Sequence, residues 1–255
     1  MSEVLPLLAL KLVLVPALMG GISLAARRWG NDVAGFLSAF PVVAGPILLL
    51  LALEHGVQFA AQAARGTLAA VLAVMAFALV YVWMARRRGP LPAATAAFVV
   101  YALAIVLLYR LAMPDSVLVL LVIAALLLAP RFVRYSGAAP SGLGRRAIVL
   151  RMLASAGLVL LVTSLSATLG AGLSGLFAMF PVMAAVLLIG THLQQDAAQL
   201  AACLRGMVLG WPAFALFCLL LWQTLPALGV LAGFALAFGA AAALQSVLGY
   251  VARAL

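Results

Sequence analysis

The sequence predicts an all-α polytopic membrane protein of about nine transmembrane helices, built as two inverted four-helix repeats joined by a linker helix. Three observations lead to this fold class. The chain of 255 residues is 68% apolar and only 8% charged. Its two halves align without a gap at an offset of 140 residues. Its arginines gather on one side of the predicted helices.

The composition excludes a soluble globular domain of this length, because such a domain has too little interior to bury so much apolar surface. Backbone amides in hydrocarbon must bond within their own segment, so long apolar segments predict helices, whereas the strands of a β-barrel would alternate in polarity. The net charge of +10 falls in short clusters at predicted helix ends. This distribution is typical of cytoplasmic loops and argues against nucleic acid as a partner.

Nine apolar segments are predicted to span the bilayer, each close to the roughly 20 residues that a spanning helix needs. The fifth is the shortest, and the prolines Pro114 and Pro130 bracket it as natural stops. The predicted spans are Val4–Ala25, Val33–Leu53, Val57–Ala85, Leu91–Tyr109, Ser116–Ala129, Ala147–Leu169, Ala171–His192, Ala198–Trp222 and Pro226–Val251.

An internal duplication divides the chain. Between residues 30–66 and 170–206, 11 of 37 aligned positions are identical. Apolar composition raises chance identity, but it does not supply matched Phe-Pro, Arg-Gly and cation positions. The duplication predicts repeat 1 at residues 1–112, a linker helix and loop at 113–145, and repeat 2 at 146–255. Aligned pairs include Phe40 with Phe180, Pro41 with Pro181, Arg65 with Arg205, Gly66 with Gly206 and Lys11 with Arg151.

The arginines predict the orientation. With loops assigned alternately to two sides, one side receives ten arginines and the other only Arg110. The richer side is predicted to be cytoplasmic, so the N-terminus is outside and the C-terminus inside a bacterial inner membrane. One linker helix between the repeats inverts the second, a common plan among transporters. The ten are Arg27, Arg28, Arg86, Arg87, Arg88, Arg131, Arg134, Arg145, Arg146 and Arg253.

Four cations lie within predicted helices or at helix ends: Lys11, Arg65, Arg151 and Arg205. A charge at the centre of a bilayer costs roughly 2.5 kcal/mol or more. Of the five Asp and Glu residues of the chain, only Glu54 is predicted to lie both close to a helix end and near a candidate site, so carboxylates within reach of the four cations are too few to pair with each of them. We therefore interpret the four as binding an anionic small molecule or lipid head group. The alternative is that their long side chains snorkel to the interface.

The Phe-Pro motif interrupts the second and seventh predicted spans. Proline removes a backbone hydrogen bond and opposes continuous helix. Freed carbonyls and helix ends can line a site near the membrane midplane, so Phe40, Pro41, Phe180 and Pro181 are candidate substrate-binding residues. The alternative is a packing kink, since proline is common in transmembrane helices.

Three titratable residues end predicted spans. Glu54 and His55 close the second, and His192 closes the seventh. Histidine titrates near neutrality, so all three are candidates for proton coupling, with simple capping of the span as the alternative. No nucleophile elbow, phosphate loop or metal-ligand spacing is found, and no enzyme activity, metal or cofactor is predicted.

The motif of the second half, Phe180-Pro181 followed by His192 and Arg205-Gly206, resembles small four-helix bacterial membrane proteins of the GlpM type. Phe40-Pro41 and Arg65-Gly66 repeat it without the histidine. The resemblance covers about 37 residues of each half, and it implies membrane location and an envelope-related role without a substrate. Two inverted four-helix units joined by one helix also resemble eukaryotic fluoride exporters, whose Thr-, Phe- and Ser-rich pore motif is absent here.

These features predict a secondary transporter or flippase for an anionic or lipid-linked substrate, with alternating access about a site at the repeat interface. A small-anion channel and a non-transporting accessory subunit of an envelope assembly are the two alternatives. A channel would bring a narrow polar track, whereas an accessory subunit would tolerate loss of its internal cations.

Overall fold

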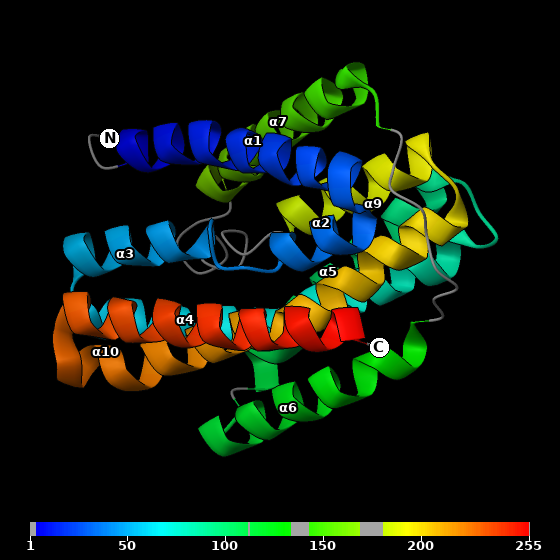
Figure 1. Cartoon of the computed structure of the whole chain (residues 1–255). Helices are drawn as coiled ribbons and strands as arrows, with labels where there is room; N and C mark the ends of the chain where they lie inside the picture. The colour runs from blue at the N-terminus through cyan, green and yellow to red at the C-terminus, as the bar shows by residue number, and fades with distance from the viewer. Residues whose placement is uncertain (1–3, 112, 134–142, 169–180, 255) are drawn as a thin grey trace.

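The computed structural model describes residues 4–111, 113–133, 143–168 and 181–254, with side chains in 12–111, 113–133, 143–161 and 181–251. All regular secondary structure in these ranges is α-helical, which confirms the predicted all-α class for them. The helices form a bundle (Figure 1). They are α1 Val4–Trp29, α2 Asn31–Ser38, α3 Ala44–His55, α4 Val57–Ala85, α5 Pro90–Leu111, α6 Asp115–Phe132, α7 Arg145–Thr168, α9 Val182–Gln194 and α10 Ala197–Ala254.

Five of the described helices, α1, α4, α5, α6 and α10, are long and apolar enough to cross a membrane. The 29 residues of α4 extend about 43 Å, more than the roughly 30 Å of a hydrocarbon core. Large apolar side chains cover the outside of the bundle, and Leu91, Leu127 and Leu231 are 79%, 71% and 87% exposed. An exposed apolar surface of this kind is compatible with a membrane as its surroundings.

The predicted span Val33–Leu53 is two helices in the structure. The helix α2 has 8 residues, α3 has 12, and Phe40-Pro41 lies between them. Pro41 has no N–H to donate, while its carbonyl accepts the N–H of Gly45 at 2.9 Å as α3 begins. The prediction that Phe40-Pro41 interrupts the helix is confirmed.

In the second half, α9 begins directly after Pro181, whereas α3 begins three residues after Pro41. The first ten residues of the predicted span Ala171–His192, which include Phe180, lie outside the described residues. With 13 residues, α9 is about 20 Å long, so it is too short to cross a bilayer by itself.

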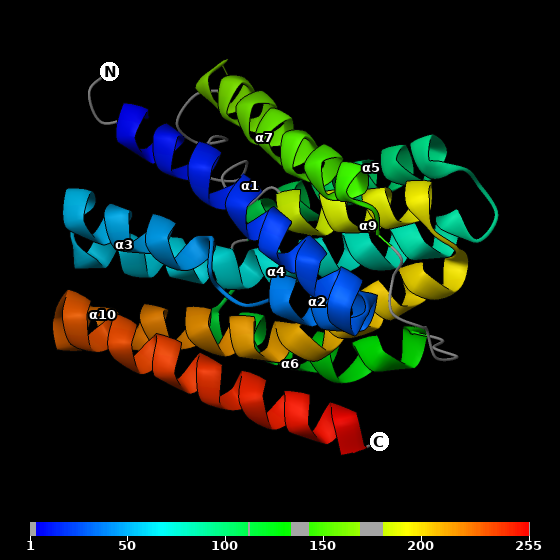
Figure 2. The ribbon, with the colours of Figure 1, turned by 45° about the horizontal axis from the view of Figure 1, so that its top comes forward.

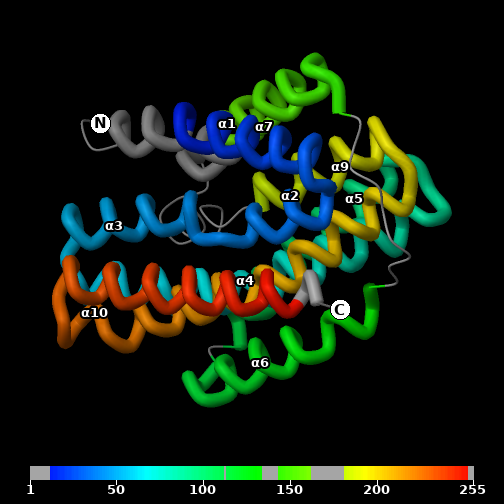
Figure 3. Tube along the Cα trace, viewed as in Figure 1, coloured from blue at the N-terminus to red at the C-terminus, as the bar shows by residue number. Residues whose placement is uncertain are grey.

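The predicted spans Ala198–Trp222 and Pro226–Val251 are the two arms of α10, which reverses its direction between them (Figure 3). The reversal lies at Gly229, whose φ is 73°. The predicted spans place this turn before Pro226, at least three residues earlier in the chain than the structure does. A reversal of this kind needs a positive φ, which glycine adopts readily and the proline ring forbids.

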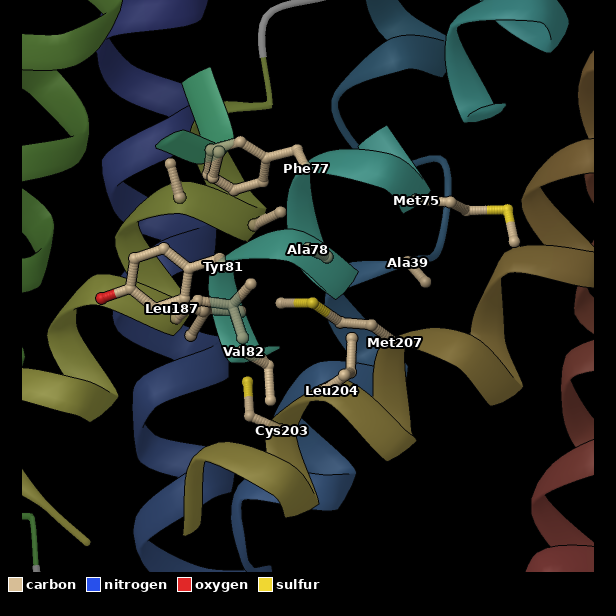
Figure 4. Packing of buried hydrophobic residues seen from close by; sticks show 14 of the residues in the cluster. Ala39, Met75, Phe77, Ala78, Tyr81, Val82, Leu187, Cys203, Leu204 and Met207 are labelled. Atoms are coloured by element: carbon tan, nitrogen blue, oxygen red, sulfur yellow. The ribbon is translucent and has the colours of Figure 1, made fainter. Parts of the chain in front are cut away.

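Helices that an offset of 140 residues relates to each other also pack together. The helix α1 packs against α7, and α4 packs against α10. The first pair lies side by side and runs in opposite directions (Figure 2). The larger buried cluster joins α4, α9 and α10, with Phe77 and Tyr81 of α4 facing Leu187 of α9 (Figure 4).

An aromatic contact recurs at the same offset. The rings of Phe77 and Phe98 lie 5.0 Å apart at 44°, and those of Phe217 and Phe238 lie 4.7 Å apart at 51°. Each member of the first pair is 140 residues from its counterpart in the second. The correspondence between the halves therefore extends beyond residues 30–66, into the packing of the helices that follow.

Backbone lies directly on backbone where α2 meets α10. A Cβ atom built on Gly206 would overlap the carbonyl oxygen of Asp32, and one built on Gly35 would overlap the carbonyl oxygen of Cys203. Only residues without a side chain permit this approach. It places Asn31 and Asp32, at the start of α2, beside the start of α10.

Candidate functional site

A group of buried and half-buried polar side chains lies at one end of the bundle. The starts of α2, α7 and α10 meet the ends of α4 and α9 there, as their side-chain hydrogen bonds show. Each of these contacts joins residues far apart in the sequence. The group, which we call the polar cluster, consists of Asn31, Tyr81, Arg151, Thr191, His192, Gln195, Gln199 and Cys203.

Arg151 is the centre of this polar cluster. Its side chain is 2% exposed and is the largest of the fully buried side chains in the described residues. Its Nη2 donates a hydrogen bond to Thr191 Oγ1 at 3.2 Å, while Nε and Nη1 have no hydrogen-bond partner in the described structure. The absence of a side chain at Gly190 makes room for the guanidinium, since a Cβ there would lie 3.0 Å from Nε.

The same turn of α9 carries a second polar contact. The hydroxyl of Tyr81 lies 3.0 Å from Nδ1 of His192, and the two rings meet nearly edge-on at 84°. Tyr81 is fully buried, and its hydroxyl points toward α9 (Figure 4). The thiol of Cys203, also fully buried, lies within hydrogen-bonding reach of Thr191.

Asn31 ties α2 to the start of α10. Its Nδ2 donates to Gln195 Oε1 and, at 2.9 Å, to Gln199 Oε1. Asn31 is 1% exposed, and its Oδ1 has no hydrogen-bond partner in the described structure. The asparagine therefore joins α2 to the end of α9 and the start of α10.

Arg65, the predicted counterpart of Arg205, lies elsewhere. Its Nε donates to Asp115 Oδ1 at 2.8 Å, and its Nη2 donates to the carbonyl oxygen of Met113 at 2.7 Å. The guanidinium also lies 5.7 Å from the ring centroid of Trp222. Arg65 is therefore paired with a carboxylate, which α6 supplies.

The remaining predicted cations are placed less completely. Lys11 belongs to α1, and its side chain lies outside the described residues. Arg205 is half-buried on the first arm of α10 and has interactions of its own. Of the four cations, Arg151 is therefore the one whose described environment is buried and lacks a carboxylate.

Phe40, Pro41 and Pro181 stand at helix interruptions or starts and outside the polar cluster. Phe40 packs on Phe238, with ring centroids 6.4 Å apart, and Pro41 is buried. Pro181 is buried at the start of α9, and Phe180 lies outside the described residues.

The two candidates for proton coupling in the first half are surface residues. Glu54 and His55 are exposed at the end of α3, where the imidazole of His55 packs on Phe59. Only His192, of the three titratable candidates, joins the polar cluster.

Tyr81, Thr191, Cys203 and Asn31 were not singled out from the sequence. Residues that recur at the 140-residue offset were given weight there, and these four do not recur. Their counterparts are Leu221, Leu51, Ala63 and Ala171. The signal that could have found them is a difference between the halves: a polar residue in one half is aligned with an apolar residue in the other.

Within the described residues, no group of three or more His, Cys, Asp or Glu side chains is placed to hold a metal ion. Comparison of the chain with protein-family models, with curated proteins and with solved structures finds no match. The fold and the composition define the class, an all-α protein with the long apolar helices of a membrane protein.

Proposed function

We propose that this protein is a secondary transporter or flippase of a bacterial inner membrane, which moves an anionic or lipid-linked substrate by way of Arg151. The observation that carries the proposal is the buried guanidinium with two nitrogens unpartnered in the described structure. A buried cation is costly unless it is paired, and an anionic ligand would pair it. The planar fork of arginine matches the oxygens of a phosphate, sulfate or carboxylate.

The arrangement of the helices supports transport by two inverted units. The helix α1 packs against α7, and α4 packs against α10. Helices related by a two-fold axis in the membrane plane would meet in this way if they lie next to the axis. The recurring aromatic contacts, Phe77 with Phe98 and Phe217 with Phe238, agree with such an axis. In this proposal nine spans cross the bilayer, α6 is the linker, and the arginine-rich loops are cytoplasmic.

The half-helices give the Phe-Pro residues a role. Both α3 and α9 start after a Phe-Pro pair and are too short to cross the bilayer, so their N-termini lie within it. Helix N-termini carry a partial positive charge that favours anions. We assign Phe40, Pro41, Phe180 and Pro181 to the substrate path that continues from Arg151.

The test uses two probes that separate a free oxyanion from a lipid head group. Binding of radiolabelled sulfate is measured by equilibrium dialysis, and binding of phosphatidylglycerol by native mass spectrometry. The wild-type protein is expected to bind one of them, and Arg151→Ala to bind it on the order of ten- to a hundredfold more weakly. Arg65→Ala is the matched control, because Arg65 already has Asp115 as its partner. Its affinity should stay unchanged.

Failure of the wild-type protein to bind either probe, or equal binding by Arg151→Ala, would contradict an anion site at Arg151. Uptake into proteoliposomes then tests transport itself. Saturable uptake is the expected result. A conductance that does not saturate would replace the transporter with a small-anion channel, and binding without uptake would replace it with an accessory subunit.

A further inference from the structure

The pair formed by Tyr81 and His192 lies one residue along α9 from the contact between Thr191 and Arg151. A phenol keeps its proton at neutral pH, so the hydroxyl of Tyr81 donates and Nδ1 of a neutral His192 accepts. In that state Nε2 carries the ring proton. Taking up a proton from water at Nδ1 turns the ring into a two-donor cation, and Tyr81 must then accept.

A protonated His192 would be a second cation on the residue next to Thr191, to which Arg151 donates. Two like charges repel strongly in a medium of low dielectric constant, and each makes the other less stable. An anion held by Arg151 reverses this relation, because it attracts both. Occupancy of the anion site and protonation of His192 therefore favour each other, and such a linkage is reciprocal.

We propose that His192 is a proton-binding site coupled to the anion site, so that one proton is taken up with each anion and the two cross the membrane together. This inference rests on the function proposed above. It names the coupling ion and the direction of coupling, which is symport of an anion with a proton.

The other ionisable groups around α9 leave this role to His192. Tyr81 faces it from α4, Arg151 on α7 bonds its neighbour Thr191, and Cys203 lies on α10. From α2, the charge of Asp32 acts on Cys203, and on α5 the buried ionisable residue is Tyr101. Of the side-chain types in this group, only histidine ordinarily changes charge between pH 5 and 8.

The test measures sulfate binding between pH 5.5 and 8.5, a range in which sulfate keeps its charge. Between the titration midpoints of His192 in the free and in the anion-bound protein, sulfate affinity should fall about tenfold for each unit by which the pH rises. His192→Gln should bind sulfate with an affinity that does not change with pH. Tyr81→Phe should keep the dependence with a shifted midpoint. His55→Gln, the exposed histidine, should behave as wild type.

If phosphatidylglycerol is the bound probe, its occupancy is followed by native mass spectrometry over the same pH range, where its phosphodiester also keeps its charge. Binding that is independent of pH in wild type, or equally dependent in His192→Gln, would overturn the proton site and leave the anion site intact. Absence of binding at every pH would instead overturn the anion site, so the two failures are distinguishable.

Discussion

A fully buried arginine without a carboxylate partner is rare, because desolvating the guanidinium costs several kcal/mol. In the described part of the chain, Arg151 receives one hydrogen-bond partner, the hydroxyl of Thr191, in return. An arginine kept for fold stability would be expected to have hydrogen-bond acceptors for most of its guanidinium nitrogens. A side chain kept for a ligand is expected to lower the stability of the empty protein.

The substitution Arg151→Met separates these two roles. Methionine fills much of the same space without a charge, and such replacements of buried ions are often neutral or stabilising by about 1–4 kcal/mol. The melting temperature of the purified protein should therefore be equal or higher, while anion affinity is lost. Destabilisation by about 3 kcal/mol or more would show instead that the guanidinium holds the helices together.

The sequence could place Arg151 among the candidates, but it could not place its neighbours. Tyr81 and His192 are 111 residues apart, and Asn31 reaches Gln195 across 164 residues. Contacts at such distances depend on how the helices pack, which single-chain patterns do not specify. The partner of Arg65 was missed for the same reason, since Asp115 belongs to another helix, α6, 50 residues further along the chain.

At the scale of elements, the crossing of α2 and α10 decides the geometry of the polar cluster. Gly206 permits the contact that sets the start of α2 beside Gln199 and Cys203. Its counterpart in the first half is Gly66, which has open space where a Cβ would be. The same Arg-Gly pair thus has different neighbours in the two halves.

The difference predicts unequal effects of one chemical change. In Gly206→Ala the new methyl group meets backbone of α2, which cannot move aside as a side chain can, and overpacking of this kind costs about 1–3 kcal/mol or more. In Gly66→Ala the added methyl group meets no neighbouring atom, and alanine in a helix makes the folded state about 0.5–1 kcal/mol more stable than glycine does. Thermal melting of the two variants should therefore shift in opposite directions. Equal shifts would contradict the close approach of α2 to α10.

The extents of the helices were largely predictable. The bounds of α4 match the predicted span Val57–Ala85, because a long apolar run between turn residues determines a helix in hydrocarbon. The interruption at Phe40-Pro41 followed from proline chemistry. The reversal at Gly229 was misplaced because Pro226, three residues earlier, is the stronger signal in the sequence, although it does not supply the positive φ.

At the scale of the whole molecule, the central claim is that the two halves cross the membrane in opposite directions. The outward apolar surface fits a bilayer. The ends of the chain point toward opposite ends of the bundle, and α1 and α7 run antiparallel (Figure 1). Transport by alternating access depends on this arrangement, since the halves must exchange roles about one site.

Cysteine labelling at two counterpart positions tests that claim most directly. Glu54 lies in the last turn of α3 and Gln194 is the last residue of α9; they are 140 residues apart, and both are exposed. The native Cys203 and Cys218 are fully buried, so background labelling should be low. In intact cells a membrane-impermeant maleimide should label Glu54→Cys, and it should label Gln194→Cys only after the membrane is opened. Labelling of both from the same side would contradict the inverted arrangement and the transport mechanism that depends on it.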